Sequence, residues 1–306
     1  MIAVLGEALI DLIVGPAGTV NASLGGGPFN VARTIARLGG QSVFVGRLSA
    51  DGFGAMLRAA LDKDDVAVAV PALTQAPTTL AVVDVDERGV PRFRFHLAGT
   101  SAAELDRGTL ASALPSGTTA VHIGSLGLVM DPAADAIASF LEQDVPPGVL
   151  VMADPNCRAE AIGDHDRYRA RLAGVLRRAD VVKVSAEDLG YLRPGMAPMP
   201  AARSLLPDTH PSLVLITEGA RPARALTSAT EIEVPVPRVK VADTIGAGDA
   251  FGGAFVSWWT GHGLGVADLA DPATIREALE FAVRVSALTC TRYGADPPRL
   301  AAVQRS

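Results

Sequence analysis

The residues whose types and spacing are best suited to chemistry are 243–249, which read Asp-Thr-Ile-Gly-Ala-Gly-Asp. Gly246 and Gly248 precede an apolar helix pattern, so backbone N–H groups at the helix start lack intrahelical partners and lie at the positive end of the dipole. Such a helix start binds anions, and the missing β-carbons let a phosphate approach the backbone closely. Asp249 falls in the first turn, where it could take a proton from an attacking hydroxyl. The run therefore predicts phosphoryl transfer, with an anion hole beside a general base.

Two other interpretations fit the same glycines. One is an ordinary helix N-terminus, in which the dipole favours Asp249 and the glycines of the next turn allow close helix packing. The other is a Rossmann-type nucleotide site, because three glycines form G-x-G-x-x-x-G. That fingerprint needs a strand–turn–helix unit and an acid about 20 residues on. The next acid after Asp249 is Asp268, beyond the helix, so we disfavour this interpretation.

Composition excludes several classes of protein. The 306 residues carry a net charge of −6, which disfavours binding to nucleic acid. None of the three lysines follows a glycine, so a Walker A loop is absent from the sequence. Cys157 and Cys290 suit a reducing compartment better than a disulfide framework. With no signal-peptide pattern and no uncharged apolar run of membrane length, we expect a cytoplasmic protein that does not bind membranes.

These chemical groups need elements to position them, and the hydrophobic pattern locates those elements. Short apolar runs that predict buried strands alternate with amphipathic patterns that predict helices, which indicates an α/β fold with a mostly parallel sheet. Neither an internal repeat nor a linker interrupts the chain, so residues 1–306 are expected to form one domain. The expected strands are 2–5, 42–46, 120–123, 149–153, 180–184 and 213–217, and the expected helices include 53–61, 133–141 and 274–291.

The alternation breaks near residue 78. Two β-rich runs, 78–86 and 90–97, flank the turn Glu87-Arg88-Gly89 and predict a hairpin. Residues 9–14 form a further extended segment that contains Asp11. Strands outside the main alternation predict a small sheet that projects from the domain.

Polar residues recur where expected elements begin or end. Asn30 lies in the first turn of a helix after Gly26 and Gly27, where its amide suits either a sugar hydroxyl or a local cap. Asn156 and Arg158 follow the strand 149–153, at the edge where open α/β sheets bind ligands, although an Asp-Pro-Asn turn can also be purely structural.

The run 243–249 resembles the C-terminal signature of the ribokinase-like, or pfkB, carbohydrate kinases, D-T-x-G-A-G-D, at every position. Gly26, Gly27 and Asn30 resemble the family's N-terminal signature, and matches extend from Asp11 to Pro298. The resemblance implies a three-layer α/β/α sandwich with a small β-sheet lid, formed here by about 9–22 and 77–98. It also implies phosphoryl transfer from ATP to a sugar hydroxyl.

The resemblance implies a role for each matching residue. Asp249 would be the catalytic base, and Gly246, Ala247 and Gly248 would form the anion hole. The residues expected to hold the sugar are Asp11, Gly26, Gly27, Asn30, Asn156 and Arg158. The residues expected to hold the nucleotide are Lys183, Ser185, Thr217, Gly219 and Gly294.

The family's N-x-x-E motif, whose acid orders Mg²⁺ through water, is altered here. Ser185 replaces the Asn and Asp188 replaces the Glu, with Glu187 adjacent, so either carboxylate could serve. The alternative role of this segment is a helix cap, with Ser185 as the capping residue. Asp243 marks a candidate site for a monovalent cation such as K⁺.

Within the family the sequence looks most like fructokinases, through residues 6–11, 26–30, 154–156 and 182–185. A 2-keto-3-deoxygluconate kinase and a ribokinase are the alternative enzymes, because sugars with similar hydroxyls differ by few contacts. From another class, a non-catalytic sugar or nucleotide sensor could keep the fold. The expected partners are a small sugar and a second copy of the chain, bound through the lid.

Overall fold

The computed structural model describes residues 1–15, 18–85, 91–206 and 213–305, so the expected turn Glu87-Arg88-Gly89 lies outside it. The described residues form a nine-stranded sheet in which the strands from β11 to β5 are parallel. β12 and β13 add antiparallel strands at one edge. In spatial order the strands are β13 (Glu231–Val234), β12 (Ala223–Leu226), β11 (Leu213–Thr217), β10 (Val181–Ser185), β9 (Leu150–Asp154), β8 (Ala120–Gly124), β1 (Ile2–Leu5), β4 (Ser42–Val45) and β5 (Ala67–Val68).

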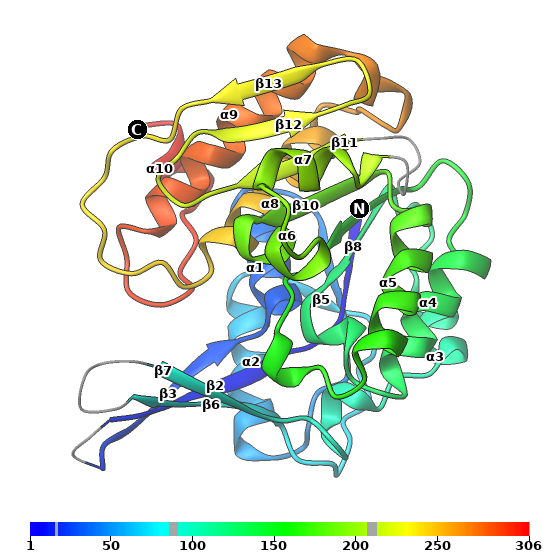
Figure 1. Ribbon diagram of the computed structural model, residues 1–306. Helices are drawn as coiled ribbons and strands as arrows, with labels where there is room; N and C mark the ends of the chain where they lie inside the picture. The colour runs from blue at the N-terminus through cyan, green and yellow to red at the C-terminus, as the bar shows by residue number, and fades with distance from the viewer. Residues whose placement is uncertain (16–17, 86–90, 207–212, 306) are drawn as a thin grey trace.

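Helices cover both faces of this sheet, because its strands are apolar on both sides. In β1, Ile2 and Val4 belong to one buried cluster, whereas Ala3 and Leu5 belong to the other. The first cluster includes residues of α1 (Gly27–Arg37), α2 (Gly52–Lys63), α8 (Ala247–Gly261) and α9 (Pro272–Thr289). The second includes residues of α3 (Arg107–Ala113), α4 (Ala133–Gln143), α5 (His165–Arg178), α6 (Ala186–Leu192) and α7 (Pro198–Arg203). The predicted three-layer α/β/α sandwich is confirmed (Figure 1).

The remaining elements are short. They are η1 (Ser101–Ala103), η2 (Ser125–Leu128), η3 (Ala159–Ala161), η5 (Ala267–Ala270) and α10 (Leu300–Val303). No helix in the described ranges combines the length and the apolarity that a membrane span requires.

A row of buried aromatic side chains holds helix α8 in place. Phe251, Phe255 and Trp259 recur every four residues on one face and are at most 1% exposed. Burying one such side chain contributes about 1.5–3 kcal/mol. The helix packs against α1 and α9, and a β-carbon at Gly253 would lie only 2.9 Å from the Cβ of Thr34. Close packing therefore sets where the α8 N-terminus points.

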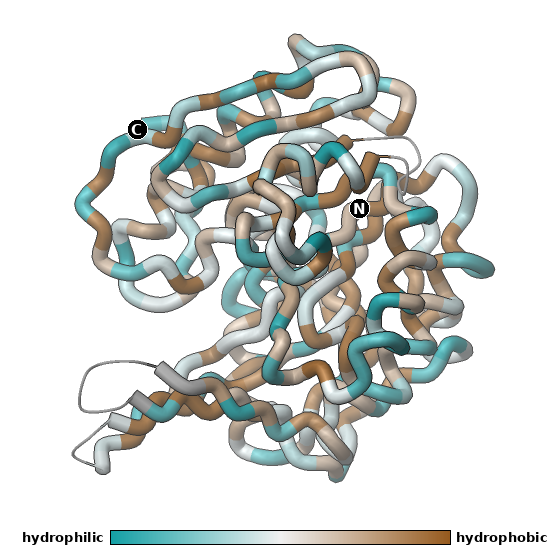
Figure 2. The backbone as a smooth tube through the Cα atoms, in the orientation of Figure 1, coloured by the Kyte–Doolittle hydropathy of each residue, from teal (hydrophilic) through white to brown (hydrophobic). Residues whose placement is uncertain are grey.

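A second, four-stranded sheet projects from the body (Figure 1), and we call it the small sheet. Apolar and polar residues are mixed along its strands (Figure 2), and they alternate strictly only in the strand that reads Pro-Arg-Phe-Arg-Phe-His. β2 pairs in parallel with β6, and the outer strands pair antiparallel. Its strands, in order, are β3 (Val20–Gly25), β2 (Leu9–Val14), β6 (Thr79–Val85) and β7 (Pro91–His96).

The two arms of the expected hairpin correspond to β6 and β7. The sequence pattern did not indicate β3, which reads Val-Asn-Ala-Ser-Leu-Gly and has little apolar alternation. Helices α3, α5 and α7 were also not expected, and α5 is rich in arginine and has few apolar positions.

Candidate active site

The starts of α1 and α8 lie together because the two helices pack side by side. As a result, Asn30 Nδ2 donates a hydrogen bond to Asp249 Oδ2 at 2.9 Å. A β-carbon at Gly27 would lie 3.4 Å from Asp249 Oδ1, so this glycine lets the carboxylate approach the start of α1. Two segments that are 219 residues apart in sequence thus meet at one carboxylate.

Burial raises the pKa of Asp249, and this effect outweighs the Asn30 hydrogen bond and the charges of Lys183 and Arg158. A carboxylate with a raised pKa accepts a proton more readily near neutral pH than an exposed one. The environment of Asp249 therefore suits a general base.

Several backbone N–H groups at the start of α8 have no hydrogen-bond acceptor among the described residues. Gly246 adopts the left-handed conformation, with φ of 74°, which a glycine accepts without strain. The N–H groups of Gly246, Gly248 and Asp249 have no partner within the described residues, whereas that of Ala247 donates to the Thr244 carbonyl at 3.2 Å. Gly248 and Asp249 thus offer adjacent helix donors, and Ala247 differs from the expected anion-hole set because its N–H is engaged.

Asp11, on β2 of the small sheet, lies close enough to this site for the charge of Asp249 to affect its pKa. Its pKa is raised to about 6, first by burial and then by the charge of Asp249, while Arg158 opposes the shift. The guanidinium of Arg158 donates to the carbonyls of Asn156 and Cys157 at 3.4 Å. The structure therefore brings the expected sugar residues of the small sheet and of the segment after β9 close to the expected base.

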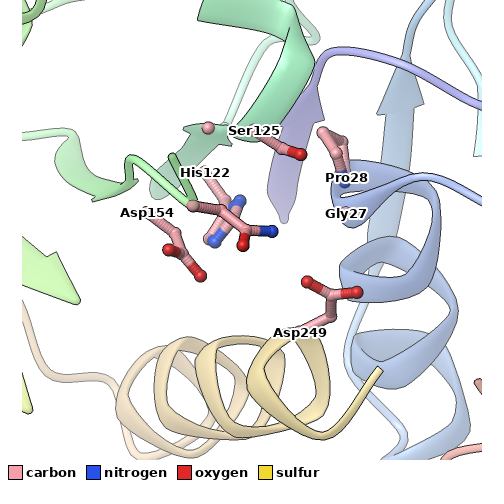
Figure 3. A pocket seen from close by; sticks show the side chains of 8 residues that line it. Gly27, Pro28, His122, Ser125, Asp154 and Asp249 are labelled. Atoms are coloured by element: carbon pink, nitrogen blue, oxygen red, sulfur yellow. The ribbon is translucent and has the colours of Figure 1, made fainter. Parts of the chain in front are cut away.

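A recess lies beside the base (Figure 3). Asp249 points into it from α8, and Asp154 and His122 approach it from the sheet. Asn156, which has a left-handed φ of 41°, also borders it. The lining residues are Gly27, Pro28, His122, Gly124, Ser125, Asp154, Asn156 and Asp249.

Buried polar atoms without partners gather around this recess. Among the described residues, Asn30 Oδ1, Asp154 Oδ1 and both ring nitrogens of His122 are buried without a hydrogen bond. Burial, helped by the charge of Lys183, lowers the pKa of His122 to about 3, so the ring is neutral at physiological pH. Buried polar groups are normally paired, so these atoms indicate that a polar ligand completes the site.

Glu7 holds the glycine turn that precedes α1. Its two carboxylate oxygens accept from the N–H groups of Gly27 at 3.1 Å and Gly127 at 2.9 Å. Burial raises the pKa of Glu7 to about 7 against these hydrogen bonds. Gly26 has a φ of 108°, and a β-carbon there would lie 2.7 Å from the Glu7 carbonyl oxygen. Position 26 therefore accepts only glycine without strain.

Four of the expected nucleotide residues lie at the ends of β10 and β11 and in two turns, whereas the fifth, Lys183, is buried in the middle of β10. Ser185 and Thr217 are paired across these strands, and Gly219 forms a left-handed turn beyond β11. The N–H of Gly294 donates to Asp243 Oδ2 at 2.9 Å. Asp243 therefore joins the turn before α8 to the loop that follows α9.

The acid expected at the N-x-x-E position has a structural role. Asp188 Oδ2 accepts from the Ser185 N–H at 2.8 Å and the Ser185 hydroxyl at 2.7 Å, and Asp188 Oδ1 accepts from the Cys157 N–H at 2.6 Å. This is a capping box that fixes the start of α6. Asp188 is buried, whereas Glu187 is exposed.

Three residues of the site were not singled out from the sequence, namely Glu7, His122 and Ser125, and Asp154 was noted only as the start of the polar run after the strand 149–153. His122 and Asp154 did carry a signal, because each is a polar residue in an otherwise apolar buried strand. A polar group at such a position costs free energy unless a partner or a ligand satisfies it.

An anion-binding helix start that faces a proton acceptor is the arrangement of a small-molecule kinase, and this is the class that the fold and the site define. The profile of the pfkB family carbohydrate kinases matches residues 1–301, and the chain belongs to that family.

Individual relatives agree with this assignment. A probable fructokinase-5 of Arabidopsis thaliana is 32% identical over 305 residues, which are 97% of this chain and 93% of that protein. The structure of a fructokinase with bound ATP from Xylella fastidiosa has a TM-score of 0.86 at 29% identity, covering 99% of this chain and 97% of that one. A fructokinase double mutant from Vibrio cholerae O395, in fructose, ADP and potassium ion bound form, has a TM-score of 0.84 at 30% identity with the same coverage.

Proposed function

We propose that this carbohydrate kinase is a fructokinase, which transfers the γ-phosphoryl group of ATP to a hydroxyl of fructose. The observation that carries the proposal is the 2.9 Å hydrogen bond from Asn30 to Asp249, because it joins an expected sugar contact to the expected base. The fructokinases among the relatives, one with ATP and one with fructose and ADP bound, support the same substrates.

The roles of the residues follow from their positions. Asp249 takes the proton from the attacking hydroxyl, while Asn30 and Asp11 bind and orient the sugar through directional hydrogen bonds. The free N–H groups of Gly248 and Asp249 stabilise the charge of the phosphoryl group as it is transferred. The small sheet, which carries Asp11, acts as the lid that excludes water, and its exposed outer end is the candidate dimer contact.

The metal requirement follows from the chemistry of the polyphosphate. When bound, Mg²⁺ would neutralise part of its charge, and phosphates and water would supply most of its ligands. The described residues contain no group of three or more His, Cys, Asp or Glu that could hold a metal ion by themselves. Because Asp188 is committed to its capping box, we assign the water-mediated contact to Glu187 instead.

Magnesium titrations of Glu187→Ala and Asp188→Ala test that assignment. Glu187→Ala should raise the Mg²⁺ concentration needed for half-maximal activity, whereas Asp188→Ala should mainly lower the melting temperature because it removes a cap. A parental magnesium curve for Glu187→Ala would contradict the assignment.

Asp243 is the proposed contact for K⁺. Among the described residues, its carboxylate accepts from the N–H groups of Thr244, Ile245 and Gly294, which leaves oxygen lone pairs for a cation. Potassium bound to the Vibrio cholerae relative supports the proposal. Exchange of K⁺ for a large organic cation should then lower kcat in the parent, and an unchanged kcat would contradict it.

ATP turnover across a panel of acceptors tests the whole proposal. The panel holds fructose, ribose, 2-keto-3-deoxygluconate and a nucleoside, and ADP is measured by a coupled assay. We expect the highest kcat/KM with fructose. A higher value with another acceptor would keep the mechanism and reject fructose, and binding of sugar without turnover would identify a sensor.

A further inference from the structure

Three polar side chains lie on the same face of three adjacent strands of the main sheet. His122, Asp154 and Lys183 belong to β8, β9 and β10, which are neighbours. Residues of the same parity in these strands, such as Ala120 and Met152, belong to the apolar cluster that includes α8. The three polar residues therefore replace apolar residues on the sheet face that α8 covers.

This polar row lies directly beneath the first two turns of α8. A β-carbon at Gly248 would lie 3.0 Å from Lys183 Nζ, and one at Gly252 would lie 3.5 Å from His122 Nε2. Lys183 Nζ donates to Asp154 Oδ2 at 2.9 Å, and both side chains are 5% exposed. The ammonium is thus held against the same helix start whose N–H groups are free.

The ammonium keeps its charge in this position. Burial by itself lowers the pKa of Lys183, but the charges of Asp154 and Asp188 and the hydrogen bond to Asp154 outweigh it, so the pKa is raised. A positive charge beside the positive end of a helix dipole is unfavourable unless an anion lies between them. The arrangement therefore favours an anion at the start of α8.

Stability alone does not explain the buried pair. Burying two charges costs about as much free energy as their attraction returns, so such a pair is weak evidence for a structural role. Moreover, Asp154 uses only one carboxylate oxygen, and its Oδ1 is buried without a partner in the described residues. A purely structural ion pair would be expected to use both oxygens.

We propose that Lys183 is a catalytic residue whose ammonium binds the transferring phosphoryl group together with the N–H groups of Gly248 and Asp249. Asp154 is the positioning residue that holds the ammonium there. The anion hole then has a charged donor as well as two dipolar ones, and charge-assisted hydrogen bonds are about twice as strong as neutral ones. This inference rests on the proposed kinase function and adds a residue pair to its mechanism.

Replacement of the lysine is the first test. Lys183→Met keeps the length of the side chain and removes the charge, and kcat should fall by about 10²–10³-fold, the scale of a lost oxyanion donor. The dissociation constant for the sugar should stay at the parental value, and Lys183→Arg should recover part of kcat. Lys63→Met is the matched control, because Lys63 is exposed at the far end of α2. A parental kcat in Lys183→Met would overturn the proposal.

Asp154 is tested through its dependence on Lys183. Asp154→Asn should lower kcat in the parent but should have no further effect on Lys183→Met, because it acts only through the ammonium. Lys183→Met leaves the buried Asp154 carboxylate without its cation, and the double variant removes that carboxylate charge as well. We therefore expect the double variant to fold even if Lys183→Met does not. If Asp154→Asn lowered kcat by the same factor in the parent and in Lys183→Met, the positioning role would be overturned.

A transition-state mimic separates this inference from the proposed function. Calorimetry measures binding of ADP alone and of ADP with aluminium fluoride, which imitates the planar phosphoryl group. In the parent, aluminium fluoride should increase the affinity for ADP. Lys183→Met should lose most of this increase, while its affinity for ADP alone stays at the parental value. Equal losses for both ligands, or no loss, would overturn the inference even if the parent phosphorylates fructose. If no acceptor gives turnover, the proposed function fails, and a fluoride gain that depends on Lys183 still supports the anion site.

Discussion

Asp64 and Asp154 are both buried, at 2% and 4% exposure, but their surroundings differ. Asp64 Oδ2 accepts from Arg33 at 2.9 Å and Arg37 at 2.8 Å, and its Oδ1 lies 3.3 Å from Arg299. Both of its oxygens are therefore partnered. Within the part of the chain that the structure describes, Asp154 has one cation and one unpartnered oxygen. The first arrangement joins α1 to the C-terminal segment, and the second leaves bonding capacity for a ligand.

The contrast extends to the groups around each carboxylate. We call Asp64 with its three arginines the Asp64 cluster, and we call Glu7, Asp11, Asp154 and Asp249 the pocket acids. Burial is the largest influence on the pKa of every pocket acid, and in each case the pKa is raised. A protein that buries acids without full compensation loses stability at that place. The Asp64 cluster should therefore serve stability, and the pocket acids should serve chemistry.

The largest effect should come from the base itself. Asp249→Asn keeps the side-chain volume, and its amide oxygen can still accept the Asn30 hydrogen bond. We expect kcat to fall by about 10²–10⁴-fold, as for loss of a general base, while the free energy of unfolding stays the same or rises. Steady-state kinetics, calorimetry with sugar and ATP, and denaturant unfolding measure the three quantities. Normal turnover would remove the role assigned to Asp249.

The opposite pattern is expected for the Asp64 cluster. Asp64→Asn removes the anion that Arg33, Arg37 and Arg299 share, although Arg37 keeps Asp296 as a partner. Breaking a buried charge network of this kind costs about 3–5 kcal/mol. Unfolding in urea should show that loss, while kcat for the folded protein stays near the parental value. A variant that is as stable as the parent but inactive would reverse the division between the two regions.

Glu7 should make stability depend on pH. Its pKa is raised from 4.5 to about 7 in the folded chain, so between these values the folded state holds a proton that the unfolded state has released. The free energy of unfolding therefore falls as pH rises through this window, by on the order of 3 kcal/mol. Denaturant unfolding at pH 5 and pH 8 should show a smaller decline in Glu7→Gln than in the parent. The same decline in both proteins would mean that Glu7 does not titrate in this range.

Asp11 should give a smaller effect that is confined to the sugar. Asp11→Ala removes a charged hydrogen-bond partner, so fructose affinity should fall by about 1.5–3 kcal/mol, and ATP affinity should not change. Asp84→Ala is the control, because Asp84 is a carboxylate of the same sheet on the opposite face, paired with Arg94. Calorimetry would contradict the assignment if both variants bound fructose as the parent does.

The sequence predicts the layered fold and the start of α8 because their information is local. Residues 243–249 carry the turn, the donors and the base in one run, and the alternation of apolar strands and helices is visible without partners. Glu7, His122 and Asp154 could not be placed in the same way. Each lies in or beside a buried strand, and its role depends on which face the strand presents to α1 or α8, which only the assembled sheet defines.

Ser185 and Asp188 show a different limit of sequence analysis. They are three positions apart in the sequence, and this spacing fits both a metal-associated motif and a capping box. Only the hydrogen bonds to the N–H groups of Ser185 and Cys157 show which structure the spacing has formed. β3 was missed for a related reason, because its pairing with β2 rather than its own composition makes it a strand.

The small sheet also affects the order in which the chain can fold. Its central strands, β2 and β6, pair in parallel from Leu9 and Thr79 onward. β2 therefore cannot pair with β6 until the intervening chain, which includes α1, β4 and α2, has been synthesised. Contacts between such distant residues form slowly, because a long loop must close first. Asp11 should therefore reach its final position after the adjacent helices, and pulse-labelling hydrogen exchange should protect α1 before β2. The sugar contact on this sheet would then be completed late in folding.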